Sequence, residues 1–256
     1  MIGPVSHRAL FVWRRNATVW RYGAMWSSLL GDLFEPILYL YGLGYGLGFF
    51  VNEVHGMDYP TFIAPGLLAM GAMWSASFEN TYAALTRMMK QKTYEAVMVT
   101  PVNPEEIVAG DILWAATKSG IGAVMMLLVV TVMGLASFPT ALLCIPQAFL
   151  TGLAFGALSM VITAVAPNYD FFMYYFTILL TPMLLFSGAW YPLDGLPEAL
   201  QVLAEVLPLT HAVRPMRAFM TGSAGIEAWW SVGVLAAYTV LFAIIAMGLV
   251  RRRLVD

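Results

Sequence analysis

Six long apolar stretches constrain this chain more than any other feature of its sequence. An α-helix rises about 1.5 Å per residue, so a hydrocarbon core of about 30 Å needs roughly 20 apolar residues. Six stretches meet that length: residues 27–49, 62–85, 112–135, 141–165, 171–190 and 229–250. Pro182 and Gly188 interrupt the fifth. The pattern predicts a single all-α integral membrane domain over residues 1–256, with about six transmembrane helices.

The composition supports this prediction and excludes other classes. The chain is 60% hydrophobic and only 11% charged, whereas a soluble domain has roughly 25% charged residues. The net charge of −2 does not favour nucleic acid as a partner. Cys144 is the one cysteine, which excludes an internal disulfide and indicates a small core residue. Arginines spread through the first 21 residues, where a signal peptide would need an apolar region.

The distribution of Lys and Arg predicts the orientation in the membrane. Basic residues occur before the first span, after the second and after the last, whereas 51–61 and 136–140 have none. Basic segments stay in the cytoplasm. Both termini are therefore predicted to be cytoplasmic, in a bacterial inner membrane. Arg214 and Arg217 run against the pattern, in a long outer segment.

The N-terminal segment, residues 5–22, is predicted to be an amphipathic helix in the membrane interface. On a helical wheel Ala9, Leu10, Trp13, Ala17 and Trp20 share one arc, next to an arc of arginines. Tryptophans at headgroup depth and arginines that reach phosphate are typical of such helices. The candidate residues are Arg8, Trp13, Arg14, Arg15, Trp20 and Arg21. The alternative is a short solvated helix before the first span.

The connection after the second span is predicted to contain a short cytoplasmic helix. Thr93–Val99 has the composition of a helix, and Pro101 ends it. Asn103 then fits an N-cap, Pro104 the first helical position and Glu106 the third, which is the capping-box pattern. The third span should therefore restart sharply at this point.

The outer segment before the last span is predicted to form two short helices over residues 196–220. Leu196, Leu200, Leu203 and Leu207 repeat at helical spacing. Pro208 ends the first helix, and a second runs through residues 212–220. Neither can span a bilayer, so both are predicted to re-enter the outer leaflet beside protein.

Motifs of catalysis and metal binding are missing. Lys118-Ser119 resembles the end of a phosphate-binding loop, but Thr117 stands where glycine is needed. The three histidines lie far apart and predict no metal site. An enzyme acting alone is therefore not expected. The charged residues inside the spans are expected to pair structurally, with a transport role as the alternative; they are Asp32, Glu35, Glu79 and Lys118.

Several segments, in order, resemble the permease subunits of ABC-2 type exporters, of the nodulation-protein J type. They are YLYGLGYGLG at 39–48, SFENTYAA at 77–84, TYEA at 93–96, DILWAATK at 111–118, TGLAF at 151–155, FSG at 186–188 with PLD at 192–194, and LPLTH at 207–211. The resemblance covers nearly the whole chain. Pro101-Val102 and Arg214 depart from the nodulation pattern, which leaves the substrate open.

The resemblance implies a partner, a second copy and a set of site residues. Such permeases dimerise and bind a separate ATPase subunit, which carries the ATP and Mg²⁺, so no cofactor is expected on this chain. The helix at 93–99 would be the coupling helix that docks on the ATPase, through Thr93, Tyr94, Glu95, Val97 and Met98. The outer re-entrant residues would be Ser187, Gly188, Pro192, Leu193, Pro208, Leu209 and His211.

Export of an amphiphile, such as a lipo-oligosaccharide or lipid-linked glycan, is the leading hypothesis. The alternatives are a drug-type ABC-2 permease, an ion-coupled secondary transporter that uses Glu35, Glu79 or Lys118, and a membrane scaffold or immunity protein. Glycines spaced four apart, Gly44/Gly48 and Gly152/Gly156, permit close helix contact. They are compatible with a dimer interface or with packing inside one chain. Membrane lipids are the remaining expected partner.

Overall fold

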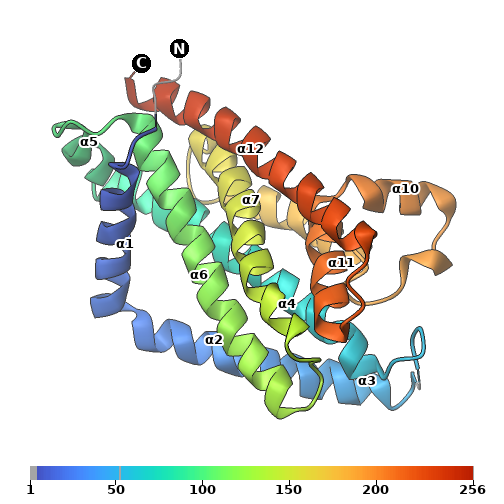
Figure 1. The fold of residues 1–256 in the computed structure, drawn as a ribbon. Helices are drawn as coiled ribbons and strands as arrows, with labels where there is room; N and C mark the ends of the chain where they lie inside the picture. Colours follow the sequence, from blue (N-terminus) through green and yellow to red (C-terminus); the bar gives the residue numbers. More distant parts are fainter. Residues whose placement is uncertain (1–4, 52, 256) are drawn as a thin grey trace.

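The structure is a computed structural model that describes residues 5–51 and 53–255. Within these residues the chain is helical, and the only β-type pairing is an isolated bridge between Val54 and Met57. The all-α prediction is therefore confirmed. Figure 1 shows the helices as a bundle, with α1 on one edge and α10 and α11 toward the other end.

Four helices in the described chain are long and apolar enough to cross a membrane. The first, Tyr59–Lys90, comprises α4 (Tyr59–Phe78) and two π-helical segments, η2 (Glu79–Ala83) and η3 (Thr86–Lys90). The second is α6 (Pro104–Val132). The third joins η4 (Thr140–Leu143) to α7 (Cys144–Val165). The fourth is α12 (Ile226–Val255). They correspond to the second, third, fourth and sixth predicted spans.

The first and fifth predicted spans are helical but irregular. The first comprises α2 (Met25–Tyr39), the π-helical η1 (Leu40–Tyr45) and α3 (Gly46–Gly48). The fifth comprises α8 (Phe171–Tyr174), η5 (Tyr175–Leu180) and α9 (Thr181–Phe186). It ends before the predicted limit at residue 190, because Gly188 adopts a left-handed backbone with φ of 75°.

The core lies where α4, α6 and α7 meet, and two glycines of α7 make it compact. A Cβ on Gly152 would lie 2.7 Å from Ala116 Cα, and one on Gly156 would lie 3.2 Å from Ala115 Cβ, both on α6. A Cβ on Gly44 of η1 would lie 3.5 Å from Ile63 on α4. These glycines pack helices within one chain, so they no longer argue for a dimer interface.

The N-terminal helix α1 (Ala9–Gly23) packs on α6 and turns at Ala24 into α2. Its buried residues are Ala9, Val12 and Asn16, whereas Leu10 is 55% exposed. Of the predicted apolar arc, Ala9 packs on the bundle and Leu10 faces outward. Gly110 of α6 allows the backbone at Ala9 to approach closely.

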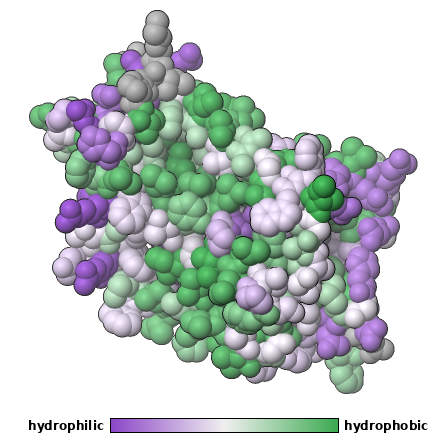
Figure 2. All heavy atoms as spheres, viewed as in Figure 1, coloured by the Kyte–Doolittle hydropathy of each residue, from purple (hydrophilic) through white to green (hydrophobic). Residues whose placement is uncertain are grey.

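The short segments lie at opposite ends of the bundle. The helix α5 (Thr93–Met98) lies near both termini, while the 3-10 turn η6 (Leu193–Gly195), α10 (Glu198–Val206) and α11 (Pro208–Thr221) lie at the other end (Figure 1). The three basic segments thus share one end. Figure 2 shows apolar side chains across the middle of this face and hydrophilic ones gathered toward its two sides, as expected for a membrane protein.

Candidate functional site

The N-terminal end of α6 is built by a local capping motif. The Asn103 and Glu106 side chains form a reciprocal capping box, and Asn103 N donates to Glu106 Oε2 at 2.9 Å. Pro104 occupies the first helical turn. This confirms the predicted restart of the helix, and it holds the preceding loop in place because two otherwise unpaired backbone amides are satisfied.

Both ends of the chain contact this same region. Ser6 Oγ donates a hydrogen bond to Glu106, and Arg8 Nη1 donates to the carbonyl of Pro101. From the C-terminal end, Arg251 Nη1 lies 2.7 Å from Glu105 Oε1, a carboxylate that is 1% exposed. The start of α6 is therefore where α1, α5 and α12 are joined.

The helix α5, which the sequence predicts to be the coupling helix, has a face that packs on the bundle and a face that is exposed. Lys92 precedes it in a left-handed conformation with φ of 53°. Tyr94 is 1% exposed, and Val97 and Met98 pack against the same buried cluster. Glu95 is exposed and pairs with Lys92 at 2.9 Å, and Val99, just beyond the helix, is 89% exposed. A partner can therefore reach Glu95 and Val99, but not Tyr94.

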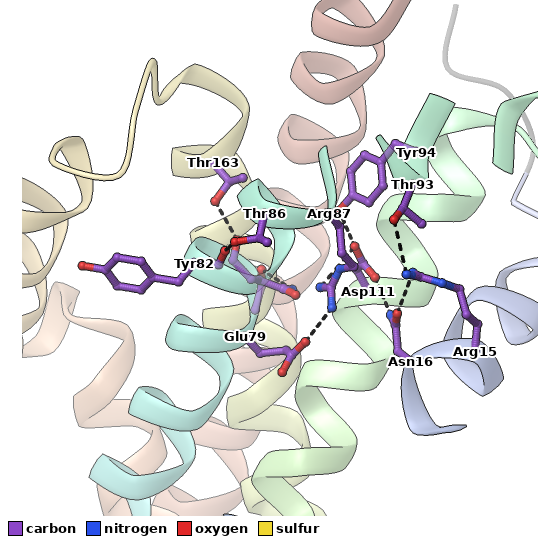
Figure 3. Close-up of polar contacts among 12 residues, drawn as sticks. Arg15, Asn16, Glu79, Tyr82, Thr86, Arg87, Thr93, Tyr94, Asp111 and Thr163 are labelled. Carbon is purple, nitrogen blue, oxygen red and sulfur yellow. Dashed lines mark hydrogen bonds and ion pairs between the residues drawn. The ribbon is translucent and has the colours of Figure 1, made fainter. Parts of the chain in front are cut away.

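Tyr94 anchors α5 to a buried polar cluster, shown in Figure 3. Its hydroxyl donates to Asp111 Oδ2 on α6, and Asn16 Nδ2 of α1 donates to Asp111 Oδ1 at 2.5 Å. Asp111 is fully buried. Burial, followed by the negative charge of Asp111, raises the pKa of the Tyr94 phenol well above its usual value. The phenol therefore stays protonated and remains a donor.

The cluster continues from Asp111 into the spans. Arg87 Nη2 lies 3.5 Å from Asp111 Oδ2, and Arg87 Nη1 donates to Glu79 Oε1 at 2.8 Å. The second oxygen of Glu79 accepts from Lys118 Nζ at 3.1 Å. Two acids and two bases neutralise one another here, as buried charges require. The predicted structural pairing is confirmed for Glu79 and Lys118, whereas Asp32 and Glu35 form no ion pair within 4 Å among the described residues.

Three further contacts hold α1 against α5 and α6. Arg15 Nη2 lies 3.5 Å from Thr93 Oγ1, and Trp13 Nε1 donates to Thr117 Oγ1 at 2.9 Å. Trp20 packs edge-on against Trp114 with ring centroids 5.7 Å apart. Arg14 and Arg21 are exposed. Trp13, Arg15 and Trp20 of α1 thus contact α5 or α6, whereas Arg14 and Arg21 are exposed.

The predicted outer residues form a separate group at the other end. Ser187 is buried, and Leu193 lies against Gly188. Pro208 begins α11, Leu209 is buried, and His211 Nε2 lies 2.8 Å from the Glu205 carbonyl. Pro192 immediately precedes η6. None of these side chains contacts the α5 region, because the two groups occupy opposite ends of the bundle (Figure 1).

Four residues in these two groups were not among the predicted site residues: Asn16, Arg87, Asp111 and Arg217. Arg217 Nη2 donates to the Gly188 carbonyl at 2.7 Å, and its guanidinium lies 4.0 Å from the ring centre of Phe62. Charged residues in mainly apolar helices were the available signal. Among residues 5–51 and 53–255, no group of His, Cys, Asp and Glu side chains is placed to hold a metal ion.

Comparison with known proteins gives this arrangement its context. The family model described as ABC-2 type transporter matches residues 9–221. The chain belongs to the ABC-2 type transporter family. It is 42% identical to nodulation protein J of Rhizobium leguminosarum bv. viciae over 96% of this chain and 94% of that protein. It is 41% identical to nodulation protein J of Sinorhizobium fredii over 96% and 93%.

A more distant relative extends the comparison beyond nodulation proteins. The chain is 26% identical to the inner membrane transport permease YadH of Escherichia coli, over 94% of this chain and 93% of that protein. Membership of the ABC-2 family establishes a permease with a transport role. The anchored helix α5 therefore lies on a membrane permease, at the end of the bundle that carries the basic segments.

Proposed function

We propose that this ABC-2 permease is the membrane subunit of an ATP-driven exporter, with a separate ATPase docked on the outward face of α5. The functional unit contains two permease chains and two ATPase subunits. It lies in the bacterial inner membrane with both termini in the cytoplasm. The cargo is an amphiphile, such as a lipo-oligosaccharide or a lipid-linked glycan.

The two-faced geometry of α5 carries this proposal. The side chain of Glu95 is 57% exposed and that of its neighbour Lys92 is 66% exposed, so both are available to a partner. Val99 offers an apolar contact beside them. Meanwhile Tyr94 ties the inner face to Asp111. A force applied to the outer face would therefore reach the spans instead of bending a loop.

The class of cargo is supported by the relatives. The use of an external energy source is supported by the pairing of Glu79 with Lys118. Proteins named nodulation protein J match this chain over nearly its whole length. Glu79 and Lys118 bind each other, which weakens an ion-coupled transporter that would use these two groups, because neither is free to cycle a proton or an ion. An external energy source, supplied by the ATPase, fits this arrangement better.

The docking proposal is tested by reversing the charge at Glu95. Wild-type and Glu95→Lys permease are affinity-purified from membranes of their own host, and the co-purifying ATPase is quantified. Loss of one partner of a desolvated charge pair weakens association by about 2–5 kcal/mol, which is about 30-fold to several-thousand-fold. We expect the ATPase and export to be lost together.

The matched control is Glu198→Lys, an exposed glutamate in the first turn of α10 at the opposite end. It should retain both the ATPase and export. Each variant is also melted alone, because an exposed ion pair such as Lys92–Glu95 contributes at most about 1 kcal/mol to stability. A Glu95→Lys permease that melts normally and keeps its ATPase would overturn the docking assignment.

A further inference from the structure

An intramembrane cavity of about 510 Å³ lies between α2, α4, α6 and the segment after α9. Its volume falls in the range of small-molecule sites, roughly 300–1,000 Å³. Glycines open two of its walls. A Cβ on Gly71 of α4 would meet nothing within 4 Å, and Gly122 of α6 leaves room for the Asp32 carboxylate, 3.7 Å from the position of its missing Cβ. The space therefore arises from the small residues with which α4 and α6 face the cavity.

The lining of the cavity changes from polar to apolar along its length. Asp32, Ser75 and Lys118 lie toward the end nearer α5, midway along α2, near the end of α4 and midway along α6. Leu67 and Met126 lie further along, where the Tyr39 and Trp190 rings meet with centroids 6.1 Å apart. This gradient matches a molecule with one polar and one apolar end.

The polar end of the cavity carries unneutralised negative charge. Lys118 is already bound to Glu79, and Glu79 is also bound to Arg87. Asp32 and Glu35 form no ion pair within 4 Å with any other described residue. Carboxylates without an ion-pair partner at membrane depth are unfavourable and typically mark a ligand or ion pathway. A positively charged group would satisfy them.

Aromatic rings that line the same cavity as these carboxylates favour one kind of cation. Trp74 and Phe78, both in the lining, stack with centroids 5.5 Å apart. Aromatic faces attract ammonium groups, and rings combined with carboxylates are the usual setting for amine recognition. A metal ion would instead need several oxygen ligands gathered at one point, which two carboxylates against aromatic walls do not supply.

We propose that this cavity binds one amphiphile per chain through a protonated amine in its head group. The ammonium pairs with Asp32 and Glu35 beside the rings of Trp74 and Phe78. The apolar tail lies along Leu67 and Met126. The inference rests on the proposed export of an amphiphile and adds the chemistry of the head group and the place where it binds.

The position of Lys118 gives this site a route to α5. Lys118 lines the cavity and begins the chain of contacts through Glu79, Arg87 and Asp111 to Tyr94. A bound ammonium competes with Lys118 for the charge of Asp32. Binding in the cavity therefore affects, through these contacts, the helix on which the ATPase is proposed to dock.

Binding is tested with radiolabelled dodecyltrimethylammonium on purified permease in nanodiscs, with empty nanodiscs subtracted. We expect saturable binding of one molecule per chain, displaced by unlabelled dodecylamine but not by dodecyl sulfate or dodecyl maltoside. Absence of a saturable component overturns the proposal. Equal displacement by dodecyl maltoside also overturns it, because the site would then recognise a neutral sugar head group.

Two variants locate the site independently. Asp32→Asn removes the charge and should weaken binding at least tenfold, whereas Glu227→Gln, outside the cavity, should not change it. Gly71→Leu places a side chain into the cavity at a residue where an added Cβ meets nothing within 4 Å, and it should also weaken binding tenfold or more. Its control is Gly42→Leu, which likewise meets open space but lies outside the cavity.

These outcomes separate the cavity from the transport function. If both cavity variants bind the ammonium like the wild type, the assignment is wrong even when export is normal. If Asp32→Asn fails to fold, Gly71→Leu decides the matter, since it removes no charged group. Loss of the ATPase from Glu95→Lys depends on the docking face alone and tests the exporter itself.

Discussion

The two regions of this permease that hold charge inside helices are built in opposite ways. Around Asp111, every charged group has a partner from another element, and the residues are buried. Along α2, none of the residues Met25–Tyr39 is buried, and Asp32 and Glu35 have no ion-pair partner among the described residues. The charges of the first region find all their partners within one chain. Those of the second region are accessible to lipid, a ligand or a second copy of the chain.

This difference indicates that the two regions have different functions. Matched charges at the start of α6 hold α1, α5 and η3 as one rigid block, because breaking any pair leaves a charge in a low-dielectric environment. None of the residues of α2 is buried, and the helix continues into the π-helical η1. The rigid block suits the transmission of force from an ATPase, and the exposed wall suits entry of a substrate.

The largest expected effect comes from Asp111→Asn. Neutralising this buried carboxylate leaves Glu79 alone against Arg87 and Lys118, a net positive charge. Removal of one partner of a buried pair destabilises by about 3–5 kcal/mol. Thermal unfolding of the purified permease should show this loss, while Asp170→Asn, at an exposed residue before α8, should melt like the wild type. Equal melting of the two would contradict the matched-charge account.

A smaller effect is expected from Tyr94→Phe, which removes only the hydroxyl that donates to Asp111. A hydrogen bond to a charged group contributes about 1.5–3 kcal/mol. We expect the ATPase to bind normally, since Glu95 and Val99 are unchanged, but ATP hydrolysis to be uncoupled from export. Tyr22→Phe is the control, because Tyr22 is 83% exposed. Full export by the Tyr94 variant would show that the anchor does not transmit force.

The junction of α1 and α6 is tested by Gly110→Ala. A Cβ at residue 110 would lie 2.6 Å from the carbonyl oxygen of Ala9, so α1 must move away, at about 1–3 kcal/mol. The control Gly233→Ala on α12 meets nothing within 4 Å and should be neutral or stabilising, as Ala is the better helix former. Limited proteolysis between α1 and α2 should increase only in the first variant. Unchanged cleavage would mean that α1 is held from elsewhere.

The smallest effect on stability is expected from Asp32→Asn. This carboxylate has no ion-pair partner within 4 Å in the described chain, so its neutralisation removes only the weaker attraction of Lys118 and relieves a charge in the spans. The melting temperature should stay the same or rise, in contrast with Asp111→Asn measured in the same nanodiscs. A clear loss of stability would show that Asp32 has a structural partner, and the comparison between the two regions would fail.

The sequence by itself determined the features that depend on neighbouring residues. Apolar stretches of sufficient length placed the helices, Asn103, Pro104 and Glu106 specified the start of α6, and Pro101 separated α5 from it. Pro208 marked the boundary between α10 and α11. These signals act within a few positions of the residue concerned, so they can be read from a single chain.

Only the tertiary structure decided which distant residues meet. Asn16 contacts Asp111 across 95 positions, and Lys118 contacts Glu79 across 39. The sequence listed Glu79 and Lys118 as charges in need of partners, but it could not choose the partner, since any helix might have been the neighbour. The same applies to Gly152 and Gly156, whose spacing fits either a dimer or one chain, and which pack on α6. Pairing is decided by the arrangement of whole helices, and that arrangement is a property of the folded chain.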